Sequence, residues 1–155
     1  MKFHIVYGSM VSGSIQYNQS ELSFDTIENE ERLFTIILED LYLGLDIGVD
    51  CKTVCAISGL SSPRLWKPSK IELPYAKDGK LTVNVPEFVQ GCGYSYSGDW
   101  HICYDRDTKM ILVSKSTYET DYGDNCQYVK FLKNAISVLR GTELIALYIE
   151  GVNIH

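Results

Sequence analysis

The stretch Tyr94–Ser114 limits the possible folds most, because it has the pattern of a β-hairpin. Within Trp100–Tyr104 an apolar or aromatic side chain stands at every second position, which is the period of a strand buried on one face. Residues 105–108 are polar and predict a turn, and the apolar run Met110–Val113 predicts the returning strand. The chain therefore contains an antiparallel sheet.

A second hairpin is predicted in the first third of the chain. Leu41–Val49 alternates strictly between apolar and other residues, Asp50–Lys52 has turn composition, and Thr53–Ser58 returns as the partner strand. The composition of Ser9–Ser20 favours a loop, and Asp78–Gly79 is typical of a tight turn. Further strands are expected at Phe3–Tyr7, Leu22–Phe24, Ile71–Tyr75, Leu81–Val85 and Glu143–Ile149.

Residues 26–40 allow two interpretations. Asp25 followed three positions later by Glu28 resembles a helix start, because the two side chains can cap each other's backbone amides. The β-branched run Phe34–Leu38 instead favours a strand. A short helical turn followed by a strand would satisfy both signals, and the sequence does not decide between them.

The segment after residue 125 predicts a helix. Apolar residues recur there at steps of three and four, Asp124 or Asn125 can cap the start, and Gly141 suits the end. The recurring positions are Tyr128, Phe131, Leu132, Ala135, Ile136 and Leu139. We therefore expect an α+β fold: a single domain over residues 1–155, with a mainly antiparallel β-sheet and a C-terminal helix packed on one face.

Charge and hydropathy restrict the class of partner. The 155 residues carry a formal net charge of −6, and most of the excess lies in residues 1–50. Nucleic-acid binders need clustered Lys and Arg, so an acidic chain is better suited to a basic protein partner. No apolar run approaches the ~18 residues of a membrane span, and the N-terminal residues lack a signal-peptide pattern. We expect a cytoplasmic protein that binds neither nucleic acid nor membrane, in an oligomeric state that the sequence leaves open.

The five cysteines offer weak candidates for chemistry. The pairs Cys51/Cys55 and His101/Cys103 lack the spacing of a zinc site, so we expect no metal and no other cofactor. A small cysteine-dependent enzyme remains the alternative function. It would use Cys92, which lies between two glycines, or Cys126, whose thiol pKa the predicted helix start would lower. Neither has a histidine nearby in the sequence to act as a base.

An interaction surface is the remaining candidate. Tyrosines and carboxylates gather before and after the hairpin, where rigid aromatic anchors and negative charge suit a basic partner. The expected partner-binding residues are Tyr94, Tyr96, Asp99, Tyr118, Glu119, Asp121, Tyr122 and Asp124. No catalytic residue is expected.

With these features the chain resembles the small acidic immunity proteins of bacterial toxin systems. The resemblance rests on the strand Leu41–Val49 with its return, the segment Gly59–Pro63 with Trp66, the Gly79–Leu81 turn and the hairpin Trp100–Val113. It implies a protein without enzymatic activity that binds and blocks a toxin domain, often a basic nuclease. The acidic and aromatic surface would then cover the active site of the toxin.

Overall fold

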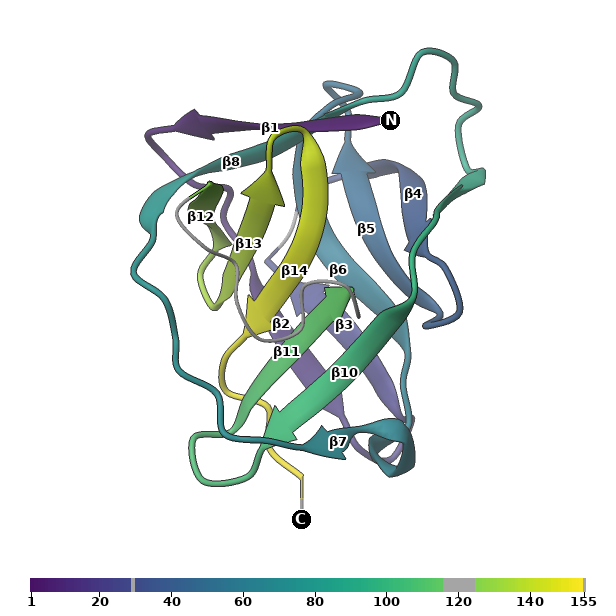
Figure 1. Ribbon diagram of the computed structural model, residues 1–155. Coiled ribbons are helices and arrows are strands. Elements are labelled where there is room, and N and C mark those ends of the chain that lie inside the picture. The colour runs from purple at the N-terminus through teal and green to yellow at the C-terminus, as the bar shows by residue number, and fades with distance from the viewer. Residues whose placement is uncertain (29, 116–124, 155) are drawn as a thin grey trace.

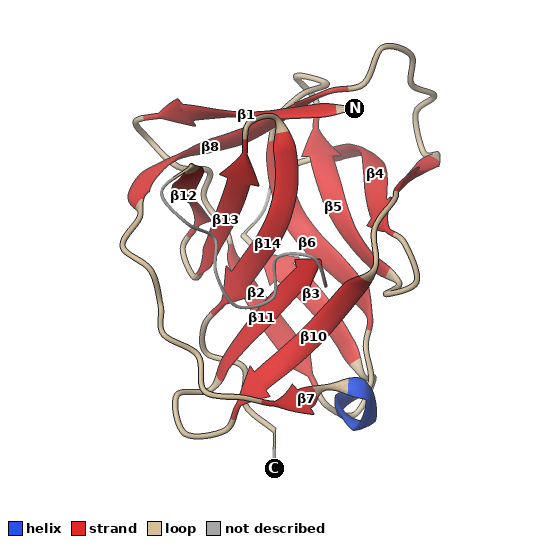
Figure 2. Ribbon diagram, viewed as in Figure 1, coloured by secondary structure: helices blue, strands red, loops and turns tan. Residues whose placement is uncertain are grey.

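The computed structural model describes residues 1–28, 30–115 and 125–154, and the fold is all-β. Two mixed sheets of eight and six strands face each other, and the one helical element among the described residues is the 3₁₀ helix Pro63–Leu65 (Figure 2). In the view of Figure 1, part of the small sheet lies behind the large sheet, and the rest lies to the right of it.

The large sheet joins the N-terminal strand to the C-terminal half of the chain. Its order is β1 (Lys2–Tyr7), β8 (Lys77–Asn84), β12 (Cys126–Leu132), β13 (Ala135–Arg140), β14 (Glu143–Ile149), β11 (Met110–Lys115), β10 (Trp100–Asp105) and β7 (Lys67–Pro68). The pairs β8–β12 and β7–β10 are parallel, and the other neighbours are antiparallel.

The small sheet comes mostly from the first sixty residues. Its order is β2 (Ser14–Asn18), β3 (Ser23–Ile27), β6 (Val54–Leu60), β5 (Leu43–Gly48), β4 (Arg32–Leu38) and β9 (Gly93–Tyr96). Only β9 runs parallel to its neighbour. Residues 97–99 then carry the chain from β9 across to β10 in the large sheet.

The main core lies between the sheets and includes Leu45 and Ile57 from the small sheet and Ile111 and Phe131 from the large one. A second apolar cluster lies apart from this core, and Ile136, Val138 and Ile145 of β13 and β14 belong to it. Ile71, from the segment between β7 and β8, is buried in the same cluster. The central strands of the large sheet are therefore buried on both faces.

The two hairpins expected from alternation are confirmed. β10 and β11 pair antiparallel, and β5 and β6 do the same. The alternating face of β10, Trp100, Ile102 and Tyr104, is buried in the main core. This face packs against residues of the small sheet, whereas the sequence predicted that a C-terminal helix would cover the sheet.

The expected C-terminal helix is wrong, and with it the α+β class. The segment forms the antiparallel hairpin β12–β13, which turns at Lys133 and Asn134. Apolar residues occupy both faces of these strands, and Ala135–Leu139 is buried at every position. Buried residues on both faces, with one register shift between Lys130 and Leu132, produce the steps of three and four that a helix would also show. Gly141 (φ +61°) lies in the turn between β13 and β14.

One open question is settled and three expectations are wrong; the first of these is the strand expected at Ile71–Tyr75, which lies in the irregular segment between β7 and β8. Residues 26–40 contain the end of β3 and all of β4, so the strand interpretation holds, and the Asp25 carboxylate pairs with Arg32. Ser9–Ser20 contains strand β2. Asp78–Gly79 lies inside the continuous strand β8, where a Cβ on Gly79 would stand 2.7 Å from the carbonyl oxygen of Val6. This glycine serves close packing between strands, and no turn forms there.

Candidate functional site

Two of the expected partner-binding residues have structural contacts. The ring of Tyr94 packs edge-on against Phe34, and its hydroxyl accepts a hydrogen bond from the amide of Val89. The hydroxyl of Tyr96 accepts from the amide of Leu144 at 3.0 Å, and its ring stands 5.1 Å from that of Phe3. Both rings are half buried, and Tyr96 links the small sheet to the large one.

Asp99 is the expected residue that reaches solvent most fully among those described. Its side chain is 81% exposed, and Oδ2 lies 3.6 Å from Nε2 of His101. Tyr118, Glu119, Asp121, Tyr122 and Asp124 lie outside the described residues, so their assignment stays a prediction.

A pocket of about 440 Å³ opens between β10, which begins one residue after Asp99, and the turns at one end of the small sheet. We call it the apolar pocket. Its apolar lining comes from Leu22, Tyr42, Leu60, Leu65, Trp100 and Ile102. The 3₁₀ helix supplies Leu65, and the turn between β4 and β5 supplies Tyr42.

Four of these apolar residues are exposed although they lie together. Tyr42 and Leu65 are each 79% exposed, Leu60 is 63% exposed, and Leu22 is 41% exposed. Apolar residues scattered singly over a surface need no explanation, whereas several converging on one concave site mark a place where another molecule binds.

Three residues that line this pocket have an unusual backbone conformation. Leu22, Asp40 and Tyr42 have φ values of 53°, 68° and 56°, in the left-handed region that side chains other than glycine rarely adopt. Gly59 (φ +134°) lies directly against the Tyr42 turn, where an added Cβ would stand 2.0 Å from the carbonyl oxygen of Tyr42. The close approach of β6 to this turn therefore requires glycine, and it fixes the position of Tyr42.

An aromatic cluster supports the pocket from beneath. Trp66 is buried against Tyr17, Phe24 and Tyr104, with ring centroids 5.0 to 6.0 Å apart. Its indole nitrogen donates to the hydroxyl of Ser61, a pocket residue, at 2.9 Å. The walls are thus held in place before any ligand arrives, which lowers the entropy lost on binding.

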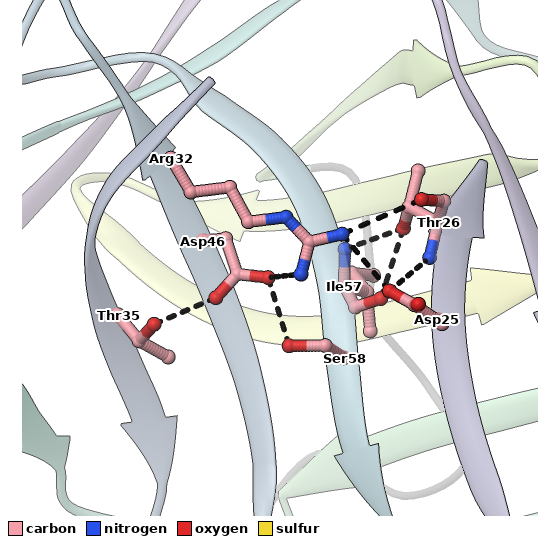
Figure 3. A network of polar contacts seen from close by, with 7 residues as sticks. All are labelled: Asp25, Thr26, Arg32, Thr35, Asp46, Ile57 and Ser58. Atoms are coloured by element: carbon pink, nitrogen blue, oxygen red, sulfur yellow. Dashed lines mark hydrogen bonds and ion pairs between the residues drawn. The ribbon is translucent and has the colours of Figure 1, made fainter. Parts of the chain in front are cut away.

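A polar network holds the strands that carry these turns (Figure 3). The Arg32 guanidinium lies between Asp25 and Asp46, 2.9 Å and 3.0 Å from their oxygens. Asp46 is buried and also accepts hydrogen bonds from the hydroxyls of Thr35 at 2.6 Å and Ser58 at 2.8 Å. The network links four strands, β3 to β6.

The same network affects Asp25. Partial burial alone would raise the pKa of its carboxyl, but the hydrogen bonds from Arg32 and the Thr26 amide, with the charge of Arg32, lower that pKa below its ordinary value. The carboxylate therefore stays ionised at neutral pH.

Carboxylates also line the apolar pocket. Glu21 and Asp40 are exposed and line it, and Asp99 precedes the lining residue Trp100 in the sequence. Lys67 is the one lysine in the lining, so negative charges outnumber it. An apolar pocket with surplus negative charge suits a ligand that combines apolar surface with positive charge.

The five cysteines lie in different environments. All five are free, and burial, with the charges of Asp46 and Glu30, raises the pKa of Cys55 to about 11. Cys92 is exposed in the loop before β9. Cys126 begins a strand, so the helix start that was expected to lower its pKa does not exist. No group of three or more His, Cys, Asp or Glu that could hold a metal ion occurs among the described residues.

Sequence reasoning missed most of the pocket. It placed Asp99 on a binding surface and Trp100 on a buried strand face, but Leu60 and Leu65 gave no signal by themselves. The alternation of Leu41–Val49 did set Tyr42 on the face opposite the leucines. This predicted exposure of an aromatic residue was the one sequence signal that pointed toward the pocket.

Comparison with known proteins adds no relative: no protein-family model matches the chain, and no curated protein sequence is similar to it. No helix in the described part of the chain has the length and apolar character to cross a membrane.

Proposed function

We propose that the protein is a protein-binding module without enzymatic activity, which neutralises a bacterial toxin domain by binding it through the apolar pocket. The observation that carries the proposal is the convergence of exposed Tyr42, Leu60 and Leu65 on one pocket that carboxylates also line. Exposed tyrosine in a rigid setting is a frequent binding hot spot, and carboxylates accelerate association with a basic partner.

The resemblance to immunity proteins supports the choice of a toxin as the partner. An immunity protein works by covering its toxin, so it needs a binding surface and no catalytic group. The acidic total charge of −6 suits a basic toxin such as a nuclease.

The test is co-expression with the products of the neighbouring genes. Each flanking gene is induced in a bacterial host with and without this chain, and growth is measured. We expect one flanking product to stop growth alone and to be tolerated when this chain is present. If no flanking product is toxic, or if the chain gives no protection, the proposal is wrong.

A matched pair of variants ties protection to the pocket. Tyr42→Ala should weaken protection, whereas Tyr75→Ala should not, because Tyr75 is as exposed, at 84%, but lines a different surface with Tyr7 and Tyr128. Equal protection by both variants would place the docking surface elsewhere.

A further inference from the structure

Strand β7 pairs with only part of the outer edge of β10, and the unpaired part, Trp100–Ile102, lines the apolar pocket; we call this part the open edge. β10 is six residues long, but its outer neighbour β7 pairs only with Cys103 and Tyr104. Before β7 the chain forms the 3₁₀ helix, and the amide of Trp66 donates to the carbonyl of Pro63 and not to β10. Among residues 1–28, 30–115 and 125–154, no strand pairs with Trp100–Ile102 on this side.

The backbone of Trp100 and Ile102 faces this open edge. The carbonyl of Tyr104 accepts a hydrogen bond from the amide of Ser69 at 3.0 Å, so Tyr104 directs its backbone groups toward β7. Successive residues of a strand direct these groups to opposite edges, and residues two and four positions earlier therefore face the same edge as Tyr104. The amide of Ile102 and both groups of Trp100 lie beyond Lys67, where β7 begins.

Strand β2, at one edge of the small sheet, shows how the fold covers a strand edge that has no neighbouring strand. The side chain of Asn134 accepts from the amide of Ile15 at 2.8 Å and donates to its carbonyl at 2.9 Å, so it occupies the edge of β2 as a strand would. Native proteins commonly protect exposed edges by such means. In the described part of the chain no side chain makes such a pair of hydrogen bonds with the backbone of Trp100 or Ile102, although both residues are largely buried, at 4% and 5% exposed.

We propose that an extended segment of a basic protein partner adds to the large sheet along Trp100–Ile102, in line with β7, and places an apolar side chain in the apolar pocket. The proposal rests on the proposed function and specifies how the partner docks. In strand addition the main-chain hydrogen bonds supply affinity, and pockets for alternate side chains supply specificity.

The pocket provides the room and the charge for this segment. Its volume of about 440 Å³ lies beside Trp100–Ile102 of β10, and its lining includes Glu21 and Asp40. A segment that alternates apolar and basic residues would place the apolar ones against Leu22 and Leu60 and hold the basic ones near these carboxylates.

The probe is an acetylated six-residue peptide that alternates lysine and valine, added to the full chain. Amide hydrogen exchange is followed by NMR. At saturating peptide we expect the exchange of the Ile102 amide to slow by roughly tenfold, because it acquires a hydrogen bond to the peptide. The same peptide with glutamate in place of lysine should bind at least about tenfold more weakly.

Backbone methylation of the peptide tests the strand geometry. One version carries N-methyl groups on the lysine nitrogens and the other on the valine nitrogens. Because only alternate amides of an added strand face β10, one version should lose roughly tenfold in affinity and the other much less.

The proposal is overturned if both methylated peptides bind as well as the parent, or if the peptide shifts Leu22 and Tyr42 signals without protecting Ile102. Equal binding of the glutamate peptide would overturn the basic character of the segment. These results are separable from the proposed function, since protection in co-expression can succeed while strand addition fails, and the peptide can bind when no flanking product is toxic.

Discussion

At the scale of single residues, Tyr42 and Trp100 line the same pocket with different roles. Trp100 is 4% exposed and packs in the main core, so Trp100→Ala should cost about 3–5 kcal/mol of unfolding free energy. Tyr42→Ala removes an exposed ring and should change it by less than about 0.5 kcal/mol. Chemical denaturation of both variants measures the difference. If Trp100→Ala were harmless, the assignment of core and surface at β10 would be reversed.

Gly59 tests whether the pocket wall depends on close backbone packing. An alanine Cβ there would collide with the Tyr42 carbonyl, so we expect Gly59→Ala to lower the unfolding free energy by about 2 kcal/mol or more. Gly8 is the control, because its φ of +137° is nearly the same and nothing lies within 4 Å of an added Cβ. The collision at Gly59 should make its variant clearly the less stable of the two in thermal unfolding. Equal losses would assign the cost to φ alone.

At the scale of elements, the turn between β12 and β13 connects the two sheets. The Asn134 amide bonds the backbone of Ile15 and donates to the Glu150 carbonyl at 2.9 Å. Asn134→Ala leaves these partly buried groups unpaired and should cost about 1–3 kcal/mol in denaturant unfolding. Asn134→Asp keeps the acceptor for Ile15 but loses both donated bonds, so it should fall between alanine and the parent. An alanine variant of unchanged stability would contradict a linking role for this turn.

Acid should weaken the contact that holds Ile71, a residue of the second apolar cluster, against Asp105. The Asp105 carboxylate accepts from the amides of Ile71, Asp107 and Thr108 at 2.9, 3.0 and 3.3 Å, and the bond from Ile71 is the main reason that the pKa of Asp105 is lowered. A carboxyl with a lowered pKa in the folded state stabilises above its unfolded value and loses that contribution as pH falls through the folded value. The loss therefore lies below about pH 4.

Asp105→Asn checks this linkage. The variant should be less stable at pH 7 and should lose less stability between about pH 5 and 2, as followed by urea unfolding at each pH. Asp107→Asn, at an exposed neighbour, should follow the parent profile. Asp25 and Asp50, whose pKa values are also lowered, contribute an acid loss of the same sign that remains in both variants. An unchanged slope in Asp105→Asn would contradict the link between Ile71 and this carboxylate.

How far the sequence predicts each element depends on which faces the fold buries. Strands β5 and β10 have one apolar face that alternation reveals, and their hairpins were predictable. β12 and β13 are apolar on both faces, and a strand of that kind has the same local pattern as a buried helix. β2 was missed because Ser14–Asn18 contains a single buried residue, Ile15. The pocket could not be predicted, because its residues come from separate turns and strands that only the tertiary structure brings together.

At the scale of the whole molecule, charge and shape combine at one end of the paired sheets. The acidic excess of residues 1–50 belongs to the small sheet and its turns, and two of its carboxylates, Glu21 and Asp40, line the apolar pocket. Association with a basic partner should therefore slow as ionic strength rises, because salt screens charges that are separated by more than about 10 Å. The apolar contacts in the pocket should be less sensitive to salt.

The most direct measurement is amide hydrogen exchange over the whole chain, free and in complex with the toxic product identified by co-expression. The account predicts protection centred on residues 40–42, 60–65 and 100–102, with β1, β8 and β12 unchanged. Protection confined to β1, β8 and β12, with no change around Tyr42 and Ile102, would contradict the assignment of the apolar pocket as the docking surface.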